Sequence, residues 1–329
     1  MKALLFSFNT VAPMAILLMM GYLFRKKGLF TAEFVSRGSK LCFYVLLSCS
    51  LFKNLYDSQL TAVPVRLVSF IVVAIIAETV IGYLLARALT NKREQMGVII
   101  QGVSRSNFAY LGIPLSTMIF TDSALIAETS GKLSIVSVFV IPLFNILAVF
   151  ALTYFSQESG EDHLKRAFRN LLRNPCIISV SLGVMVLLFR KAVPVSAFVI
   201  RDKLPFIYKV IGYLATMSTP FSLLMVGAGM EPTGENNSRR QLIPSVLMKN
   251  LILPVAVFIT AALIGGFNRV DFAVMISVFA SPTAVNSAIM ARQMGADDQL
   301  ASEIVVYTTA FSMISLVMII FGLTTTGCL

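Results

Sequence analysis

The sequence predicts an all-α, polytopic membrane protein with ten transmembrane helices. Of its 329 residues, 57% are hydrophobic and only 13% are charged, and the mean hydropathy is +0.83, which excludes an ordinary soluble globular protein. A helical span needs roughly 20 apolar residues to cross roughly 30 Å of hydrocarbon, so this chain has room for about ten spans with short loops. Polar breaks that contain proline interrupt two of the apolar runs, which suggests one site shared by the two halves of the chain.

Five apolar runs fill the first half of the chain. The first covers about 4–24 and is followed by Arg25, Lys26 and Lys27. In a cleaved signal peptide the positive charge precedes the apolar core, so we expect a retained first span with its N-terminus outside. The other four runs lie at about 38–52, 64–89, 96–120 and 133–155.

A polar, charged linker separates these runs from five more. The second set lies at about 175–189, 205–230, 242–266, 272–290 and 300–323. We therefore divide the chain into a first five-span repeat at 1–156, a cytoplasmic linker at 157–173 and a second five-span repeat at 174–329. Because each repeat holds an odd number of spans, the second repeat is expected to be inverted relative to the first.

The positions of proline and glycine support an internal repeat. A Pro-x7-Gly spacing begins at Pro13 in the first run and recurs at Pro175 in the sixth run. Pro114 and Pro282, in the fourth and ninth runs, are separated by nearly the same offset. The broken runs therefore occupy corresponding places in the two halves.

The distribution of Lys and Arg predicts the orientation in the membrane. Connections that follow odd-numbered spans hold fifteen of these residues, whereas the other connections hold ten with Lys2 included. Cytoplasmic connections carry the excess of positive charge, so the odd connections are expected in the cytoplasm and both termini outside. The net charge of +11 fits cytoplasmic loops that face anionic lipid, and no nucleic-acid partner is expected.

The two breaks predict a binding site for an anion. Asn107, Gly112 and Pro114 interrupt the fourth run, and the segment 280–287, which contains Pro282, interrupts the ninth. Irregular backbone at this depth is tolerated where it lines a polar cavity. Because proline is favoured at the first position of a helix, Pro114 and Pro282 can each open a half-helix whose positive end faces the cavity.

Neutral polar side chains at the breaks supply further ligands. The side chains that can replace the hydration shell of a bound anion without adding a charge are those of Asn107, Ser281, Thr283 and Asn286. The alternative interpretation is that the prolines only kink their helices, which neighbouring helices tolerate. Two breaks that contain asparagine at corresponding positions favour the binding site.

Charged and polar residues within the spans are candidates for substrate binding and ion coupling. Arg105, just before the first break, can pair with a substrate carboxylate or with Glu78. Glu78, near the middle of the third run, can carry a coupling proton. Lys249 lies near the start of its span, where snorkelling to the interface is an equally good interpretation. Asn145, in the fifth run, is either a packing residue or a site residue.

No metal site or cofactor is expected. The four cysteines are scattered without metal-binding spacing, and the single histidine, His163, lies in the charged linker. The chain lacks a His-Glu-x-x-His motif and a Gly-x-Ser-x-Gly motif, so an enzyme is not expected.

The breaks also carry a family resemblance. The sequence N-F-A-Y-L-G-I-P-L at 107–115 and A-S-P-T-A-V-N-S at 280–287, on a ten-span chain with a hydrophilic central linker, resemble the auxin efflux carrier family. The chain is similar to its compact bacterial branch of malate or malonate permease-like proteins. The resemblance implies scaffold and transport regions that each draw on both repeats, elevator-type movement and a homodimer. It places Asn107, Pro114 and Pro282 where broken helices 4 and 9 cross.

Two features depart from the plant members of that family. The linker is far shorter than their cytoplasmic loop, so phosphorylation control of that kind is not expected. Auxin is doubtful as the substrate, because nothing in the sequence specifies an indole pocket and tryptophan is absent.

Together these observations predict a secondary active transporter for a small organic anion, such as a mono- or dicarboxylate. We expect it in the plasma membrane, a bacterial inner membrane, working as a symporter with protons or sodium or as a uniporter. The alternatives are an anion channel and a sensor with a transporter fold. The expected substrate-binding residues are Arg105, Asn107, Tyr110, Gly112, Pro114, Ser281, Pro282, Thr283 and Asn286. The candidates for ion coupling are Glu78, Asn145 and Lys249.

Overall fold

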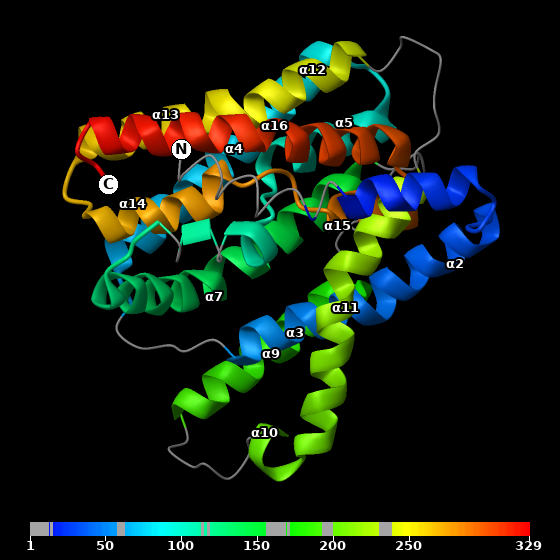
Figure 1. The fold of residues 1–329 in the computed structure, drawn as a ribbon, viewed down its shortest axis with the longest axis horizontal. Coiled ribbons are helices and arrows are strands. Elements are labelled where there is room, and N and C mark those ends of the chain that lie inside the picture. The colour runs from blue at the N-terminus through cyan, green and yellow to red at the C-terminus, as the bar shows by residue number, and fades with distance from the viewer. Residues whose placement is uncertain are drawn as a thin grey trace.

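The computed structural model shows a helical protein (Figure 1). It describes residues 13, 16–57, 63–112, 115, 116, 119–155, 169, 172–192, 200–229 and 239–329. Within these ranges every named element is a helix, and strand-like pairing is limited to an isolated bridge between Ser106 and Thr283. The prediction of an all-α protein is confirmed for this part of the chain.

A long, continuous helix replaces the short second span that the sequence predicted. Thr31 caps its start, because its side chain accepts a hydrogen bond from the backbone N–H of Phe34 at 3.1 Å. The helix consists of α2 (Ala32–Leu41), η1 (Cys42–Leu46) and α3 (Leu47–Asp57). The predicted span at 38–52 was too short, because the polar and charged residues at both ends of this helix lower the local hydropathy.

The first half continues with α4 (Val65–Leu89), α5 (Arg93–Ser104), η2 (Phe108–Gly112) and α7 (Ser123–Tyr154). The second half contains α9 (Pro175–Ala192), α10 (Ile200–Lys203), α11 (Pro205–Gly229), α12 (Arg239–Leu247), η4 (Met248–Ile252) and α13 (Leu253–Ile264). It ends with α14 (Arg269–Met275), η5 (Ile276–Ala280), α15 (Asn286–Gln293) and α16 (Asp298–Thr325). The predicted linker at 157–173 lies almost wholly outside the described residues, as does most of the predicted first span.

Several helices are long and apolar enough to cross a membrane. In the described ranges these are Val65–Leu89, Ser123–Tyr154, Pro205–Gly229 and Arg239–Ile264, and α16 adds a fifth if its two parts, bent by 46°, form one span. Pro175–Phe189 is a shorter apolar helix. These helices support a membrane protein. The count of ten spans and their inverted arrangement stay predictions.

The helices form two groups, and each group takes members from both halves of the chain (Figure 1). In the first group α3 packs against α9 and α11, and α2 packs against α11. In the second group α5 packs against α4, α7 and α16, and α14 packs against α7. The two groups meet where α7 contacts α3 and α9 and where α15 contacts α11 and η1.

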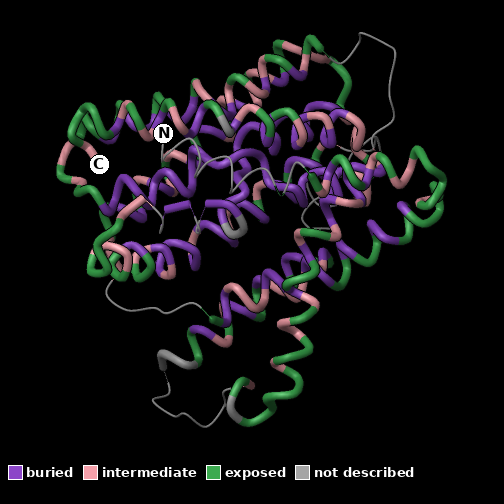
Figure 2. The backbone as a smooth tube through the Cα atoms, in the orientation of Figure 1, coloured by how far each residue is buried: buried purple, intermediate pink, exposed green. Residues whose placement is uncertain are grey.

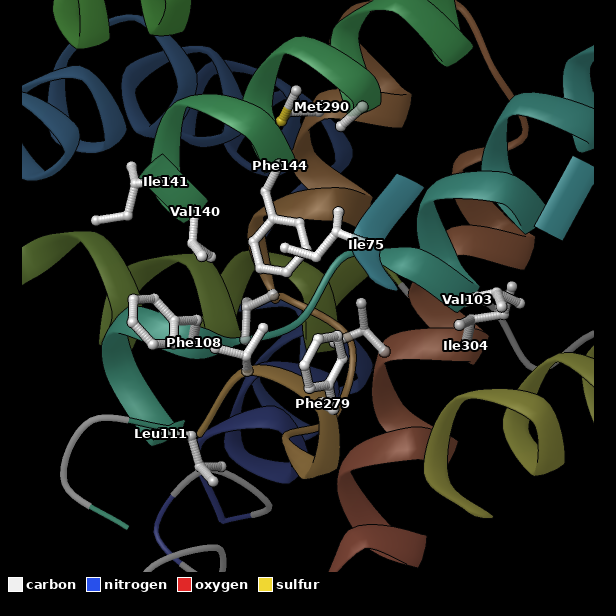
Figure 3. Close-up of a cluster of buried hydrophobic side chains, with 14 of the residues drawn as sticks. Ile75, Val103, Phe108, Leu111, Val140, Ile141, Phe144, Phe279, Met290 and Ile304 are labelled. Atoms are coloured by element: carbon white, nitrogen blue, oxygen red, sulfur yellow. The ribbon is translucent and has the colours of Figure 1, made fainter. Parts of the chain in front are cut away.

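The most buried part of the chain lies where α5, η5 and α15 come together, whereas the outer faces of the long helices are exposed (Figure 2). Apolar side chains from several helices enclose the two breaks, as the close-up in Figure 3 shows. Phe108 and Phe279, which flank the first and second breaks, are both buried in this cluster. The breaks are therefore surrounded by tightly packed apolar side chains.

An ionic contact fastens the start of α7 to the start of α14. The Lys132 ammonium lies 2.8 Å from Asp271 Oδ1 and 3.0 Å from Glu128 Oε1, and the side chains of Lys132 and Asp271 are only 20% and 13% exposed. Replacing Lys132 with Met is expected to lower the free energy of unfolding by about 1.5–3 kcal/mol, because charge-assisted hydrogen bonds at a half-buried site are lost. Thermal unfolding in detergent measures this effect.

Arg37 provides the matched control for that variant. It pairs with Glu33 at 2.6 Å, but both side chains are more than two-thirds exposed. Arg37→Gln is therefore expected to change stability by less than about 1 kcal/mol. Equal losses in the two variants would show that burial of the Lys132 contact makes no difference.

Candidate functional site

The two helix breaks lie side by side and are joined through their backbones. The helix α5 ends at Ser104, and η5 is followed by Ser281 in extended conformation. Between the breaks, the N–H of Asn107 donates to the carbonyl of Pro282 at 2.8 Å and the N–H of Ala284 donates to the carbonyl of Arg105 at 3.2 Å. This short antiparallel pairing satisfies backbone groups that would otherwise be unpaired at the centre of the protein.

The local sequence explains why η5 ends at the second break. Pro282 has no N–H to donate, and its ring disfavours helical backbone at the preceding residue, Ser281. The backbone of Ser281 is accordingly extended, with φ −70° and ψ 143°. The next helix, α15, begins at Asn286.

That start corrects one detail of the prediction. Pro282 does not occupy the first position of α15, because a short irregular segment separates it from Asn286. Pro114 lies outside the described residues, so its predicted place at the start of a half-helix is not tested. The positive end of α15 nevertheless lies at the break, and the side chain of Asn286 lines the cavity described below.

Three of the predicted substrate-binding residues make close contacts within the protein. Thr283 Oγ1 donates to the carbonyl of Gly102 at 2.6 Å, and Ser281 Oγ donates to the carbonyl of Ser277 at 2.8 Å. At Gly112 a Cβ atom would lie 2.3 Å from the backbone oxygen of Ser277, so only glycine allows η2 to pack this closely against η5. Side-chain contacts of Tyr110 lie outside what the structure describes.

A small cavity of about 40 Å³ lies beside the breaks. The volume has room for about three water molecules. The cavity is lined by Leu51, Asn54, Arg105, Ser106, Asn107, Phe108, Ile141, Phe144, Asn145, Ala284 and Asn286. Four of the predicted site residues, Arg105, Asn107, Asn145 and Asn286, therefore converge on it.

The wall of this cavity also includes two residues of α3 that were not among the predicted site residues. Leu51 and Asn54 come from α3, beyond or at the edge of the predicted second span. Asn54 could have been recognised as a candidate if the predicted span had been extended to Asp57, because it would then be a polar residue within a buried helix. Hydropathy alone ended that span too early.

Arg105 brings a buried positive charge to the cavity. Its side chain is 5% exposed, and its Nη2 donates to Asn145 Oδ1 at 3.0 Å, while Nη1 points at the sulfur of Met290. Within the described residues no carboxylate lies close enough to form an ion pair with it. The predicted alternative of a pair with Glu78 is not formed in this structure, because the Glu78 carboxyl oxygens have no hydrogen-bond partner among the described residues.

Asparagine side chains complete the polar part of the cavity. Asn145 donates its Nδ2 to the carbonyl of Ile141 at 2.7 Å, which turns its oxygen toward Arg105. Asn107 is 3% exposed, and its Nδ2 has no hydrogen-bond partner among the residues that the structure describes. A buried donor without a partner lowers stability unless a ligand or water satisfies it.

Two more ionisable side chains, Lys249 and Glu78, are buried in this half of the molecule's helix packing. The Lys249 ammonium, on η4, donates to Ser106 Oγ at 2.5 Å and is buried, which excludes the snorkelling alternative in this structure. Glu78, on α4, is also buried, and its carboxyl oxygens make no hydrogen bond within the described ranges.

A larger cavity elsewhere lacks the chemistry of a binding site for an anion. It measures about 320 Å³ and lies between α13 and α16, where side chains such as Val255, Phe258 and Met318 line it. No charged side chain contributes to its wall. Among the described residues, no group of three or more His, Cys, Asp or Glu side chains could hold a metal ion.

Comparison with known proteins gives one family and similar archaeal relatives. The family model described as "Membrane transport protein" matches residues 6–167 and 161–320. An uncharacterized transporter of Methanothermobacter thermautotrophicus is 23% identical over 319 residues, which cover 94% of this chain and 96% of the relative. An uncharacterized transporter of Methanocaldococcus jannaschii is 20% identical, with 93% of this chain and 95% of the relative covered.

Proposed function

Because the chain belongs to the membrane transport protein family, as the resemblance to auxin efflux carriers predicted, we propose that it is a secondary transporter for a small organic anion. The family match supports transport across a membrane, and it implies a transporter rather than an enzyme. The class of substrate comes from the cavity at the two breaks.

The observation that carries this proposal is the buried guanidinium of Arg105. Its hydrogen-bond partner is the neutral amide of Asn145, so its charge is not compensated by a carboxylate in the described part of the chain. A buried charge without a counter-ion is strongly unfavourable, and a substrate carboxylate would supply that counter-ion. Asn107 and Asn286, on the two breaks, would donate hydrogen bonds to the same carboxylate.

The small volume of the cavity, about 40 Å³, favours a carrier over an open channel. Apolar side chains of Phe108, Ile141 and Phe144 form part of its wall. We propose that the helix group containing both breaks moves relative to the group formed by α2, α3, α9 and α11, as in an elevator. Ion coupling through Glu78 or Lys249, a homodimer and external termini are further parts of this proposal.

The proposal is tested on purified protein with a screen of small carboxylates. A ligand that binds only the folded state raises the free energy of unfolding, and with it the melting temperature. The gain in free energy is about 2.7 kcal/mol when the ligand concentration is a hundred times the dissociation constant. A carboxylate that stabilises the protein is then tested for saturable uptake and counterflow in liposomes, with and without sodium and at two pH values. Counterflow distinguishes a carrier from a channel, and binding without flux would indicate a sensor.

Asn107→Ala tests whether the cavity is where the carboxylate binds. The variant removes a buried, unpaired donor, so we expect the ligand-free protein to fold with nearly unchanged stability and affinity for the carboxylate to fall by about tenfold. Titration of the melting temperature measures both quantities. Unchanged affinity in Asn107→Ala and in Asn286→Ala would place the binding site elsewhere.

A further inference from the structure

We propose that the apolar cavity between α13 and α16, which we call the groove, binds one acyl chain of an anionic phospholipid whose phosphate lies beside Arg66. The groove shares no lining residue with the cavity at the two breaks, so this inference does not depend on the proposed substrate. It follows from the chemistry of the wall, from the length and direction of the groove, and from a positive charge at one end.

The wall of the groove is almost wholly apolar, with side chains such as Val255, Phe258 and Met318. Thr326 also contributes to the wall, but its hydroxyl donates to the carbonyl of Gly322 at 3.0 Å. Cys328, at the same end, behaves as a small apolar residue. A polar solute would lose its hydration here without replacement, so the volume of about 320 Å³ suits a hydrocarbon chain.

Small residues keep the groove open. A Cβ atom added at Gly322, on α16, would meet no heavy atom within 4 Å. Ala262 contributes a short side chain from α13. A long apolar side chain at Gly322 would therefore occupy space that is available to a ligand.

The groove runs along the helices that form it (Figure 1). Its lining extends from Leu251 to Ala262, which corresponds to about 16 Å at 1.5 Å per residue. The candidate span Arg239–Ile264 ends two residues beyond Ala262. The groove therefore reaches from the end of a span to about half the depth of the roughly 30 Å hydrocarbon layer, as the acyl chains of one leaflet do.

Arg66 places a positive charge at this end of the groove. Its Nη2 donates to the carbonyl of Gly265 at 2.6 Å, directly after the end of α13, and its guanidinium lies 5.2 Å from the centre of the Phe267 ring. Within the described ranges Arg66 forms no ion pair with a carboxylate. Its side chain is exposed at the level where the span ends, so a lipid phosphate can reach it and supply the negative charge.

The charge and the apolar wall together favour one kind of occupant. A second copy of the chain, or bulk lipid, would cover the wall without a specific partner for Arg66. A diacylglycerol has the acyl chains but no phosphate, and a zwitterionic headgroup brings a positive group next to the guanidinium. An anionic headgroup such as that of phosphatidylglycerol satisfies both features.

Three lipids with identical acyl chains test the proposal on the delipidated wild-type protein in detergent. We expect phosphatidylglycerol to bind at least about fivefold more tightly than phosphatidylcholine or diacylglycerol. Native mass spectrometry counts the bound lipids, and thermal shift titration gives the affinities. A phosphatidylglycerol with a photoreactive acyl chain is expected to label α13 or α16 in preference to the other exposed helices.

Two variants test the parts of the site separately. Gly322→Leu fills the groove and is expected to lower the affinity for phosphatidylglycerol by about tenfold. Gly131→Leu is its matched control, because an added Cβ at Gly131 on α7 also meets no heavy atom within 4 Å, and it should leave lipid binding unchanged. Arg66→Gln is expected to abolish the preference for phosphatidylglycerol over phosphatidylcholine.

Each result supports or overturns the proposal. Weaker binding in Gly322→Leu with loss of headgroup preference in Arg66→Gln supports it. Equal affinities for the three lipids, or labelling spread evenly over the exposed helices, would mean that bulk lipid alone covers the groove. A Gly322→Leu protein that binds lipid normally but changes its oligomeric state would identify the groove as a contact between copies of the chain. The wild-type lipid series and the labelling decide the question even if Gly322→Leu does not fold.

Discussion

Replacing Arg105 with Gln is expected to abolish anion binding and, at the same time, to make the ligand-free protein more stable. The guanidinium is 5% exposed and pairs with no carboxylate in the described part of the chain. Its removal therefore relieves the unfavourable burial of a charge, and a gain of about 0.5–2 kcal/mol is expected. Function and stability would change in opposite directions at this position.

The loss of binding is expected to be large. Truncating one member of a buried, hydrogen-bonded charge pair weakens binding by about 2–5 kcal/mol, so affinity for the carboxylate falls by about a hundredfold at least. Flux of the carboxylate into liposomes is expected to fall to background. Melting temperatures with and without ligand give both the binding and the stability effects in one experiment.

Two further variants separate charge from geometry at this site. Arg105→Lys keeps the positive charge but loses the planar donor group that reaches Asn145, so weakened yet measurable binding is expected. Arg37→Gln, on the exposed part of α2, is the control for removal of an arginine and should leave binding intact. If Arg105→Gln destabilised the ligand-free protein and kept its affinity for carboxylates, Arg105 would be a structural residue only.

Replacing Gly112 with Val is expected to prevent stable folding. Even a Cβ atom at this position would lie 2.3 Å from the backbone oxygen and 2.9 Å from the backbone carbon of Ser277. These are backbone atoms of η5, so a rotamer change cannot relieve the clash. Adding one methyl group at a tightly packed contact lowers stability by about 1–3 kcal/mol, and Val adds three carbons where none fits.

Gly131 offers the matched control, because it lies exposed on α7 with no heavy atom within 4 Å of an added Cβ. Gly131→Ala is expected to raise stability by about 0.5–1 kcal/mol, since alanine is the better helix former. Detergent-solubilised yield and thermal unfolding compare the two variants. A Gly112→Val protein that folds and melts like the wild type would show that η2 and η5 separate readily.

Sequence reasoning located the breaks but did not reveal the contacts that their residues make within the protein. Proline and asparagine inside an apolar run are visible without a structure, because backbone chemistry makes them unfavourable in a buried helix. The role of Gly112 was not visible, since it depends on the distance to Ser277, far away in the chain. Thr283 and Ser281 were expected to face the ligand, yet they donate to backbone carbonyls.

For the buried charged residues, too, the sequence identified the residues but not their partners. Residue type and position in a span identified Arg105, Glu78 and Lys249 as unusual, and all three are buried. Which of them lie together depends on how the helices rotate against one another, and hydropathy carries no information on rotation. Glu78 was one of two alternative partners predicted for Arg105, yet its carboxyl oxygens have no hydrogen-bond partner among the described residues.

The pairing of the two breaks also has a consequence for biosynthesis. The N–H of Asn107 finds its acceptor on Pro282, and Gly102 accepts from Thr283, which lies 181 residues later. While the ribosome is still translating the second half, the first break is already in the bilayer with these groups unsatisfied. The nascent first half therefore holds these polar backbone groups unpaired until the segment around Pro282 is made, and we expect the insertion machinery or a chaperone to shield them during that interval.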